Sequence, residues 1–218
     1  QTLETPTFRT SATLKNDTEE DTDGGRESTL IFKGEQSGGE ISTLAEIEAS
    51  HDGTADDEKG DLIFRTNDGS DGSSPTEAAR IDSGQNLLVG KTAVGLSTTG
   101  IDLRSNGLIQ AIRDGGTPVE LNRQTSVGTL IDLRKDNTTV GSIGIESSGF
   151  VVDGEASHAG LKMFASAVGP RQNSSDADDT IDIGHNSGRF KDLYLSGGAY
   201  IGGTVAANKL DDFEEGTW

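Results

Sequence analysis

The sequence predicts an all-β chain with little or no helix, built from short β-hairpins. Short apolar runs recur along the chain, and most end at clusters of Gly, Asn, Asp or Ser, the residues that favour turns. No stretch has the periodicity of a convincing long helix. The 218 residues are 31% hydrophobic and include 30 Gly, which leaves little side-chain volume for one large core. A core completed by other chains is therefore expected.

The first hairpin region is expected at residues 27–92, after a polar N-terminal segment at 1–26. Two similar apolar runs, at 29–34 (TLIFKG) and 61–66 (DLIFRT), are each followed by a Gly-rich turn. Between them, residues 44–49 alternate apolar and acidic side chains, which favours a strand with one wet face. A short helix is the alternative, because Ala, Glu and Leu favour helices. We favour the strand.

The acidic run at residues 17–23 has two interpretations. Glu19, Asp21, Asp23 and Gly24 approach the spacing of a helix-flanked calcium loop. The first position is Glu19 where Asp is required, the twelfth is Leu30 where Glu is required, and no helical pattern flanks the run. A solvated turn or a disordered segment is the favoured interpretation.

A single hairpin pattern then recurs through residues 77–152, across the boundary of the expected fibre shaft at 93–170. Hairpins are expected at 79–90, at 101–112 around an Asn-Gly turn, at 130–145, and from 146 into a strand at 150–152. The pair Ile-Asp precedes a polar turn at irregular spacing, at Ile81, Ile101, Ile131 and Ile181. This is a degenerate β-repeat and not a fixed-period solenoid. The weaker part at 156–179 suggests one strand at 161–164 and an acidic loop at 173–179.

The C-terminal region, 171–218, is expected to form a β-collar that leads into a further domain beyond Trp218. A strand at 180–184 is expected to turn at 185–188 and continue from Phe190. Leu193–195 and Tyr200–Ile201 are expected to be strands joined by a turn at Gly197 and Gly198, since glycine adopts turn conformations easily.

Composition excludes several classes of function. The net charge of −19 argues against nucleic acid and against an anionic membrane surface, and no apolar stretch approaches the length of a membrane span. There is no Cys, and His51, His158 and His185 lie far apart in polar or Gly-rich loops, where surface positions are expected. No nucleophile, metal or nucleotide motif is present. We therefore expect no enzyme, no cofactor and no metal site.

Three stretches resemble tail-fibre and tailspike proteins of tailed bacteriophages, especially marine ones. They are RIDSGQNLLVG (80–90), LIDLRKDNTTVGSIG (130–144), and RFKDLYLSGG (189–198) with LDDFEEGTW (210–218). The residues themselves favour an obligate homo-oligomer, because short hairpins with little core leave exposed edges. The resemblance implies an elongated homotrimeric fibre of hairpins wound around a common axis. The residues expected to form the trimer core are Ile131, Leu133, Ile143, Ile145, Leu193, Leu195 and Ile201.

The function expected from this resemblance is structural. The chain would be a segment of a phage tail, extracellular on the virion, that holds or forms the receptor-binding apparatus for attachment to the bacterial surface. Its partners would be two further copies, other tail or baseplate proteins, and a host cell-surface glycan or protein, without nucleic acid or membrane insertion. The alternatives are a calcium-stabilised β-stalk of a bacterial surface adhesin, a glycan-degrading tailspike, and a capsid decoration protein.

Overall fold

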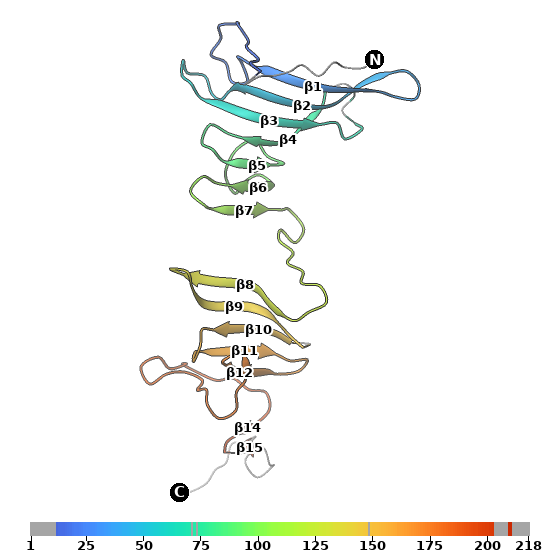
Figure 1. Cartoon of the computed structure of the whole chain (residues 1–218). Helices are drawn as coiled ribbons and strands as arrows, with labels where there is room; N and C mark the ends of the chain where they lie inside the picture. Colours follow the sequence, from blue (N-terminus) through green and yellow to red (C-terminus); the bar gives the residue numbers. More distant parts are fainter. Residues whose placement is uncertain (1–11, 71, 73, 148, 203–208, 211–218) are drawn as a thin grey trace. The chain divides into compact units, whose positions relative to one another are not determined.

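The computed structural model describes residues 12–70, 72, 74–147, 149–202 and 209–210 (Figure 1). The chain divides into two compact units, Gln1–Glu120 and Leu121–Trp218. All regular structure in the described residues is β-strand, as the sequence predicts, and the strands form antiparallel sheets. Within the same residues there is no helix with the length and hydropathy of a membrane span.

The first unit contains one seven-stranded antiparallel sheet whose strands follow one another in sequence order (Figure 1). Its strands are β1 (Ser28–Glu35), β2 (Ile41–His51), β3 (Gly60–Thr66), β4 (Thr76–Ile81), β5 (Leu87–Val89), β6 (Gly100–Leu103) and β7 (Ile109–Ile112). The segment at 44–49 lies within β2, so the strand prediction is confirmed there over the helix. The predicted hairpins at 79–90 and 101–112 are β4–β5 and β6–β7.

The turns of this sheet explain where the hairpins reverse. Between β6 and β7, Gly107 has a φ of +87° and donates its N–H to the Arg104 carbonyl. Glycine adopts this left-handed conformation without steric cost. Between β4 and β5 the positive φ, +61°, falls on Gln85 and not on Gly84. The unusual order Ser-Gly-Gln-Asn therefore places a residue with a Cβ where glycine would be less strained.

The second unit contains a six-stranded antiparallel meander. Its strands are β8 (Gly128–Lys135), β9 (Thr138–Glu146), β10 (Gly149–Gly154), β11 (Ala159–Met163), β12 (Val168–Gln172) and β13 (Ser175–Asp176). Asp136 and Asn137 connect β8 to β9, both with positive φ (50° and 64°), which is the signature of a type I′ hairpin turn. The predicted hairpin at 130–145 is thus confirmed.

Two features of the second sheet differ from the sequence prediction. Strand β12 was not predicted, because it contains Gly169 and Pro170, which usually interrupt strands. It forms because it pairs with β11 over five residues, so neighbouring strands outweigh local preference. Strand β13 lies inside the segment predicted as an acidic loop at 173–179.

The C-terminal predictions are partly wrong. Residues 180–184 form no strand, and only an isolated bridge joins His185 to Gly188. Leu193–195 also forms no strand; instead β14 (Ala199–Tyr200) pairs with β15 (Lys209–Leu210). The apolar residues here have no sheet within the described part of one chain to cover them, and strands of this kind depend on such packing. Most of the LDDFEEGTW stretch lies outside the described residues.

The buried apolar core is small. Among the described residues, the buried hydrophobic side chains are Ile63, Leu88 and Val151. Strands β6 and β7, which lie in the region predicted as fibre shaft, continue the first sheet. In the part of the chain that the structure describes, many large hydrophobic side chains are exposed, among them Leu30, Ile109 and Leu161.

Candidate functional site

One face of the first sheet is apolar from edge to edge. Directly paired residues of neighbouring strands share a face, so pairing registers define rows of side chains across the sheet. One row crosses all seven strands: Leu30, Ile47, Phe64, Ala79, Val89, Ile101 and Ala111. A second row on the same face is Ala49, Leu62, Ile81, Leu87, Leu103 and Ile109. We call these two rows the first apolar face.

The opposite face of the same sheet carries the polar residues. The row between the two apolar rows is Thr29, Glu48, Ile63, Arg80, Leu88, Asp102 and Gln110. Its only large apolar members, Ile63 and Leu88, are 3% and 0% exposed. On the first apolar face, by contrast, Val89 and Ile101 are both 41% exposed and Ile109 is 71% exposed. In most soluble proteins the apolar face of a sheet is buried and the polar face is exposed. Here the apolar side chains on the polar face are buried, whereas those on the apolar face are exposed.

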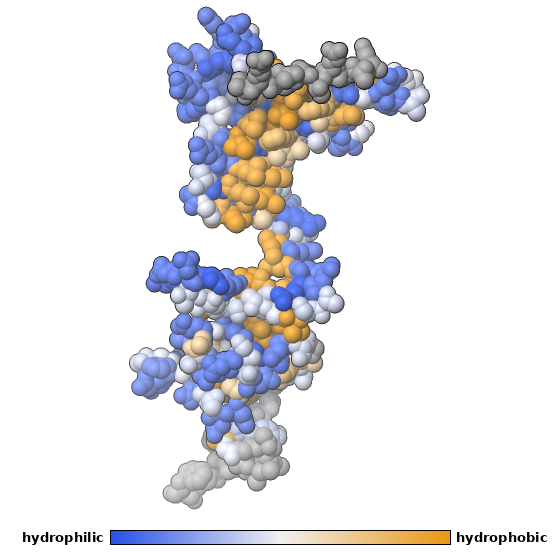
Figure 2. All heavy atoms as spheres, in the orientation of Figure 1, coloured by the Kyte–Doolittle hydropathy of each residue, from blue (hydrophilic) through white to orange (hydrophobic). Residues whose placement is uncertain are grey.

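Figure 2 shows the consequence as a patch of hydrophobic residues over the strands of the first sheet. Monomeric soluble proteins rarely expose contiguous apolar patches above a few hundred Å². Neither row contains a charged residue. The first apolar face is therefore an exposed apolar surface whose burial would be favourable.

The second sheet repeats this arrangement independently. One row is Ile131, Ile143, Val152, Leu161 and Pro170, and the next is Ile145, Phe150, Met163 and Val168. We call these rows, with Leu133 on the same face, the second apolar face. Leu133, Phe150, Val152 and Leu161 on it are exposed, whereas Val151 on the other face is buried. Two sheets in one chain thus leave the same kind of face uncovered.

The predicted core residues are distributed unequally. Ile131, Leu133, Ile143 and Ile145 lie together on the second apolar face. The others, Leu193, Leu195 and Ile201, lie outside the strands and are exposed, in the region whose predicted hairpin did not form. Their part in a trimer core stays a prediction.

Sequence analysis missed the first apolar face. It noted the alternation at 44–49 and the Ile-Asp pairs but did not combine them. The signal was present, because Ile47, Ile101 and Leu103 recur with period two in their strands. The registers that align these short segments into one surface come only from the structure.

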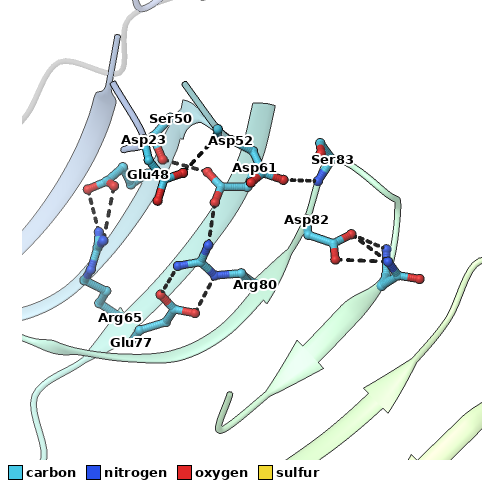
Figure 3. Close-up of polar contacts among 12 residues, drawn as sticks. Asp23, Glu48, Ser50, Asp52, Asp61, Arg65, Glu77, Arg80, Asp82 and Ser83 are labelled. Atoms are coloured by element: carbon cyan, nitrogen blue, oxygen red, sulfur yellow. Dashed lines mark hydrogen bonds and ion pairs between the residues drawn. The ribbon is translucent and has the colours of Figure 1, made fainter. Parts of the chain in front are cut away.

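Ion pairs cross the strands on the polar face of the first sheet (Figure 3). The Arg65 guanidinium donates to both Glu48 carboxylate oxygens, at 2.5 and 3.2 Å. The Arg80 guanidinium donates to Glu77 at 2.6 and 2.7 Å and to Asp61 at 2.8 Å. The paired Glu77 carboxylate raises the pKa of Arg80, although burial opposes the shift. The charges of Arg65 and Arg80 are thus neutralised by carboxylates of the same chain.

The loop at 91–99 contacts the polar face of the first sheet at β6. Asp102 is 0% exposed and accepts hydrogen bonds from the Gly95 N–H at 3.3 Å and from Arg104 at 3.1 Å. Lys91 Nζ lies 3.7 Å from the other Asp102 carboxylate oxygen and donates to the Gly95 carbonyl at 2.7 Å. Burial raises the pKa of Asp102, but the Gly95 N–H and the two cations outweigh it, so the pKa is lowered overall. The Asp102 carboxylate thereby holds the loop at 91–99 against the polar face of the sheet.

A similar network lies on the polar face of the second sheet. Arg171, 2% exposed, donates to Asp153 at 2.9 Å and also bonds Glu146 and Asp176. Lys162 bonds Glu146 at 3.1 Å. Asp153, and then Glu146, raise the pKa of Arg171. The hydrogen bonds from Lys162 and Arg171 lower the pKa of Glu146. Two cations, Arg171 and Lys162, and three carboxylates thus form one connected network of ion pairs.

The candidate catalytic and metal-binding residues are the acidic run and the three histidines. In the described residues, no group of three or more His, Cys, Asp or Glu side chains is placed to hold a metal ion. In the acidic run that resembles a calcium loop, Asp23 accepts from the Gly53 N–H and Glu20 from the Arg26 N–H. The expectation that His51 is a surface residue is wrong: it ends β2 and is buried, because two loops close over it. His158 and His185 are exposed.

No protein-family model, curated protein or solved structure matches this chain. Its function therefore has to be argued from the two apolar faces and from the residues around them.

Proposed function

We propose that this chain is a structural segment of a bacteriophage tail fibre or tailspike, in which three copies pack their apolar faces around a common axis. The assembly holds or forms the receptor-binding apparatus that attaches the virion to the bacterial surface. The observation that carries the proposal is that both sheets of one chain leave a continuous apolar face exposed. The phage context and the number three come from the resemblance of the three sequence stretches.

Energetics support association between copies. Burying the exposed half of a Val, Leu or Ile side chain contributes roughly 1 kcal/mol. The two apolar faces together contain more than ten such side chains, so covering them contributes on the order of 10 kcal/mol per chain before the costs of association. Because the core of the single chain is so small, the free energy from covering the apolar faces decides whether the chain stays folded. Folding and assembly then form one equilibrium.

Charge also favours this use of the apolar faces. The chain carries a net charge of −19, so copies repel one another wherever their acidic surfaces meet. The apolar rows carry no charge, and on the polar faces Glu48, Asp61 and Asp153 are each paired with an arginine of the same chain. Contact through the apolar faces keeps the acidic surfaces outward, where they stay solvated.

Analytical ultracentrifugation of the purified chain tests the assembly. We expect a trimer with no detectable folded monomer at micromolar concentration. A stable folded monomer would overturn the proposal. Negative-stain microscopy of the same sample then separates a fibre from a compact decoration protein, since only the fibre gives elongated particles.

Attachment to the virion is tested separately. Antibodies against the chain are expected to label the tails, and not the capsids, of phage particles that contain it. Labelling of bacterial cell surfaces in the absence of phage would instead support the adhesin.

A further inference from the structure

His51 sits at the meeting point of two loops at one end of the first sheet. It is the last residue of β2, and its side chain is 1% exposed. The backbone N–H of His51 donates to the Gly25 carbonyl, and the backbone carbonyl of His51 accepts from the Gly24 N–H, both at 2.8 Å. The loop at 18–26 therefore rests directly on the backbone of His51, while the loop at 52–59 continues from it.

The imidazole ring connects the same two loops through its side chain. Nδ1 lies 3.2 Å from the Thr22 carbonyl oxygen, in the 18–26 loop. Nε2 lies 3.2 Å from Asp57 Oδ1, in the 52–59 loop. A carbonyl and an ionised carboxylate only accept hydrogen bonds, so each contact requires a proton on the ring nitrogen. A neutral imidazole has one N–H and satisfies one contact, whereas the imidazolium satisfies both.

The contacts of Asp57 favour its ionised form. Its pKa is strongly lowered, first by the hydrogen bonds from the Lys59 ammonium and backbone N–H and then by His51. Lys59 Nζ lies 2.8 Å from Asp57 Oδ2, and Arg26 Nη2 donates to the Asp57 carbonyl at 2.9 Å. The charged side chains carried by the two loops are Glu19, Glu20, Asp21, Asp23, Arg26, Asp52, Asp56, Asp57, Glu58 and Lys59. Of these, Asp57 bonds the ring directly, and Arg26 and Lys59 are the cations bonded to Asp57.

We propose that His51 is a proton-dependent latch that fastens the 18–26 loop to the 52–59 loop. With both ring nitrogens protonated, both contacts form. When the buried ring loses one proton, a nitrogen lone pair faces an oxygen at 3.2 Å, and one contact becomes repulsive. The 18–26 loop then loosens from the end of β2. The latch lies within one chain and does not depend on the proposed assembly.

Nuclear magnetic resonance of the ¹⁵N-labelled chain tests the latch. Long-range ¹H–¹⁵N spectra report the protonation of each imidazole, and the exposed His158 and His185 are internal controls. Amide hydrogen exchange reports the loops through Gly24, which bonds His51, and Gly53, which donates to Asp23 at 2.9 Å. We expect the protection of both amides to fall about tenfold or more with the same midpoint as the His51 ring. Strand amides such as that of Leu88 should not change.

Each other outcome overturns the latch. A ring that is neutral while both loops are protected contradicts the double contact. A ring that keeps both protons until the sheet unfolds contradicts its use as a switch, and loops that stay protected through the ring titration contradict the coupling. Asp57→Asn should lower the midpoint of the loop opening, because it removes the negative charge beside Nε2. Glu58→Gln, one residue away and exposed, is the matched control and should leave the midpoint unchanged.

Discussion

The four residues Ile-Asp-Leu-Arg occur twice, from Ile101 in β6 to Arg104 directly after it, and from Ile131 to Arg134 within β8, one copy in each sheet. In both copies Ile, Asp and Leu lie in a strand, with Ile and Leu on an apolar face. Both also join Asp to the Arg two residues later, at 3.1 and 2.6 Å. The same local sequence thus produces the same local structure.

The two copies differ in what surrounds the aspartate. Asp102 is fully buried beneath the 91–99 loop beside Lys91, whereas Asp132 lies on an edge strand and stays partly exposed. The four residues thus determine that a strand forms, which side chains face the apolar side, and that Asp pairs with Arg. Burial of the aspartate depends on a loop outside these four residues. Four predictions test this comparison.

The largest effect is expected from a charge on either apolar face. Ile101→Asp and Ile131→Asp should each prevent assembly, because burying an unpaired carboxylate costs several kcal/mol. Light scattering coupled to size-exclusion chromatography measures the mass of the particle. Asn106→Asp, in the exposed turn after β6, adds the same charge and should leave the trimer intact. Assembly of both Ile variants would show that neither face lies at an interface.

The aspartates should respond unequally to loss of charge. Asp102→Asn leaves Lys91 buried without a counter-charge, so the melting temperature should fall by roughly 10 °C or more. Asp132→Asn breaks an exposed pair and should lower it by at most about 4 °C. Calorimetry of the two variants gives the comparison directly. Equal decreases would mean that the 91–99 loop does not bury Asp102 in solution.

Acid should destabilise the chain through the same carboxylates. The pKa values of Asp102 and Asp132 both lie below their usual value of 3.8, as hydrogen bonds and neighbouring cations favour the ionised forms. A lowered carboxyl pKa gives stability that is complete above the unfolded-state pKa and is lost as the pH falls through the folded-state value. The contribution of these two groups should therefore hold down to about pH 5 and decline below about pH 4.

Melting temperatures measured from pH 7 to pH 2 test this window. The decline below about pH 4 should be shallower in Asp102→Asn than in the unmodified chain. An acid decline of the same steepness in both would remove Asp102 as one of its causes.

The smallest effect concerns the turns that follow the two copies. Asn137→Gly would place the residue best suited to positive φ in the β8–β9 turn, and should stabilise the second unit by about 0.5–1 kcal/mol. Gly107→Ala forces a Cβ into a φ of +87° after β6 and should destabilise the first unit by about 1 kcal/mol. Denaturant unfolding at fixed protein concentration measures both changes. Effects of the same sign would contradict this assignment of the turns.

Calcium titration separates the proposed fibre from an adhesin stalk. The fibre should show no more than about a 2 °C change in melting temperature with millimolar calcium, because Asp23 and Glu20 are already bonded to backbone N–H groups. A rise of 10 °C or more would favour the calcium-stabilised stalk.

Sequence analysis failed where a segment depends on contacts that its own residues do not indicate. Strand β12 was missed because Pro170 and Gly169 argue locally against it, yet pairing with β11 holds it. The predicted strand at 193–195 did not form, although Leu193 and Leu195 suit a strand, since the described chain offers them no sheet. His51 was expected at the surface because its neighbours in sequence are polar. The Thr22 carbonyl that covers it is 29 residues away.

The sequence by itself determined the all-β class and the hairpins whose turns carry Asn, Asp and Gly. It also determined the separation of Ile and Leu from Asp and Arg, because alternation along a strand assigns neighbours to opposite faces. Only the tertiary structure decided the registers that align short segments into two continuous apolar faces. It also decided which face is covered, since the 91–99 loop buries Asp102 and leaves Ile101 exposed. Burial depends on what lies opposite a residue in space, and a linear pattern does not contain that information.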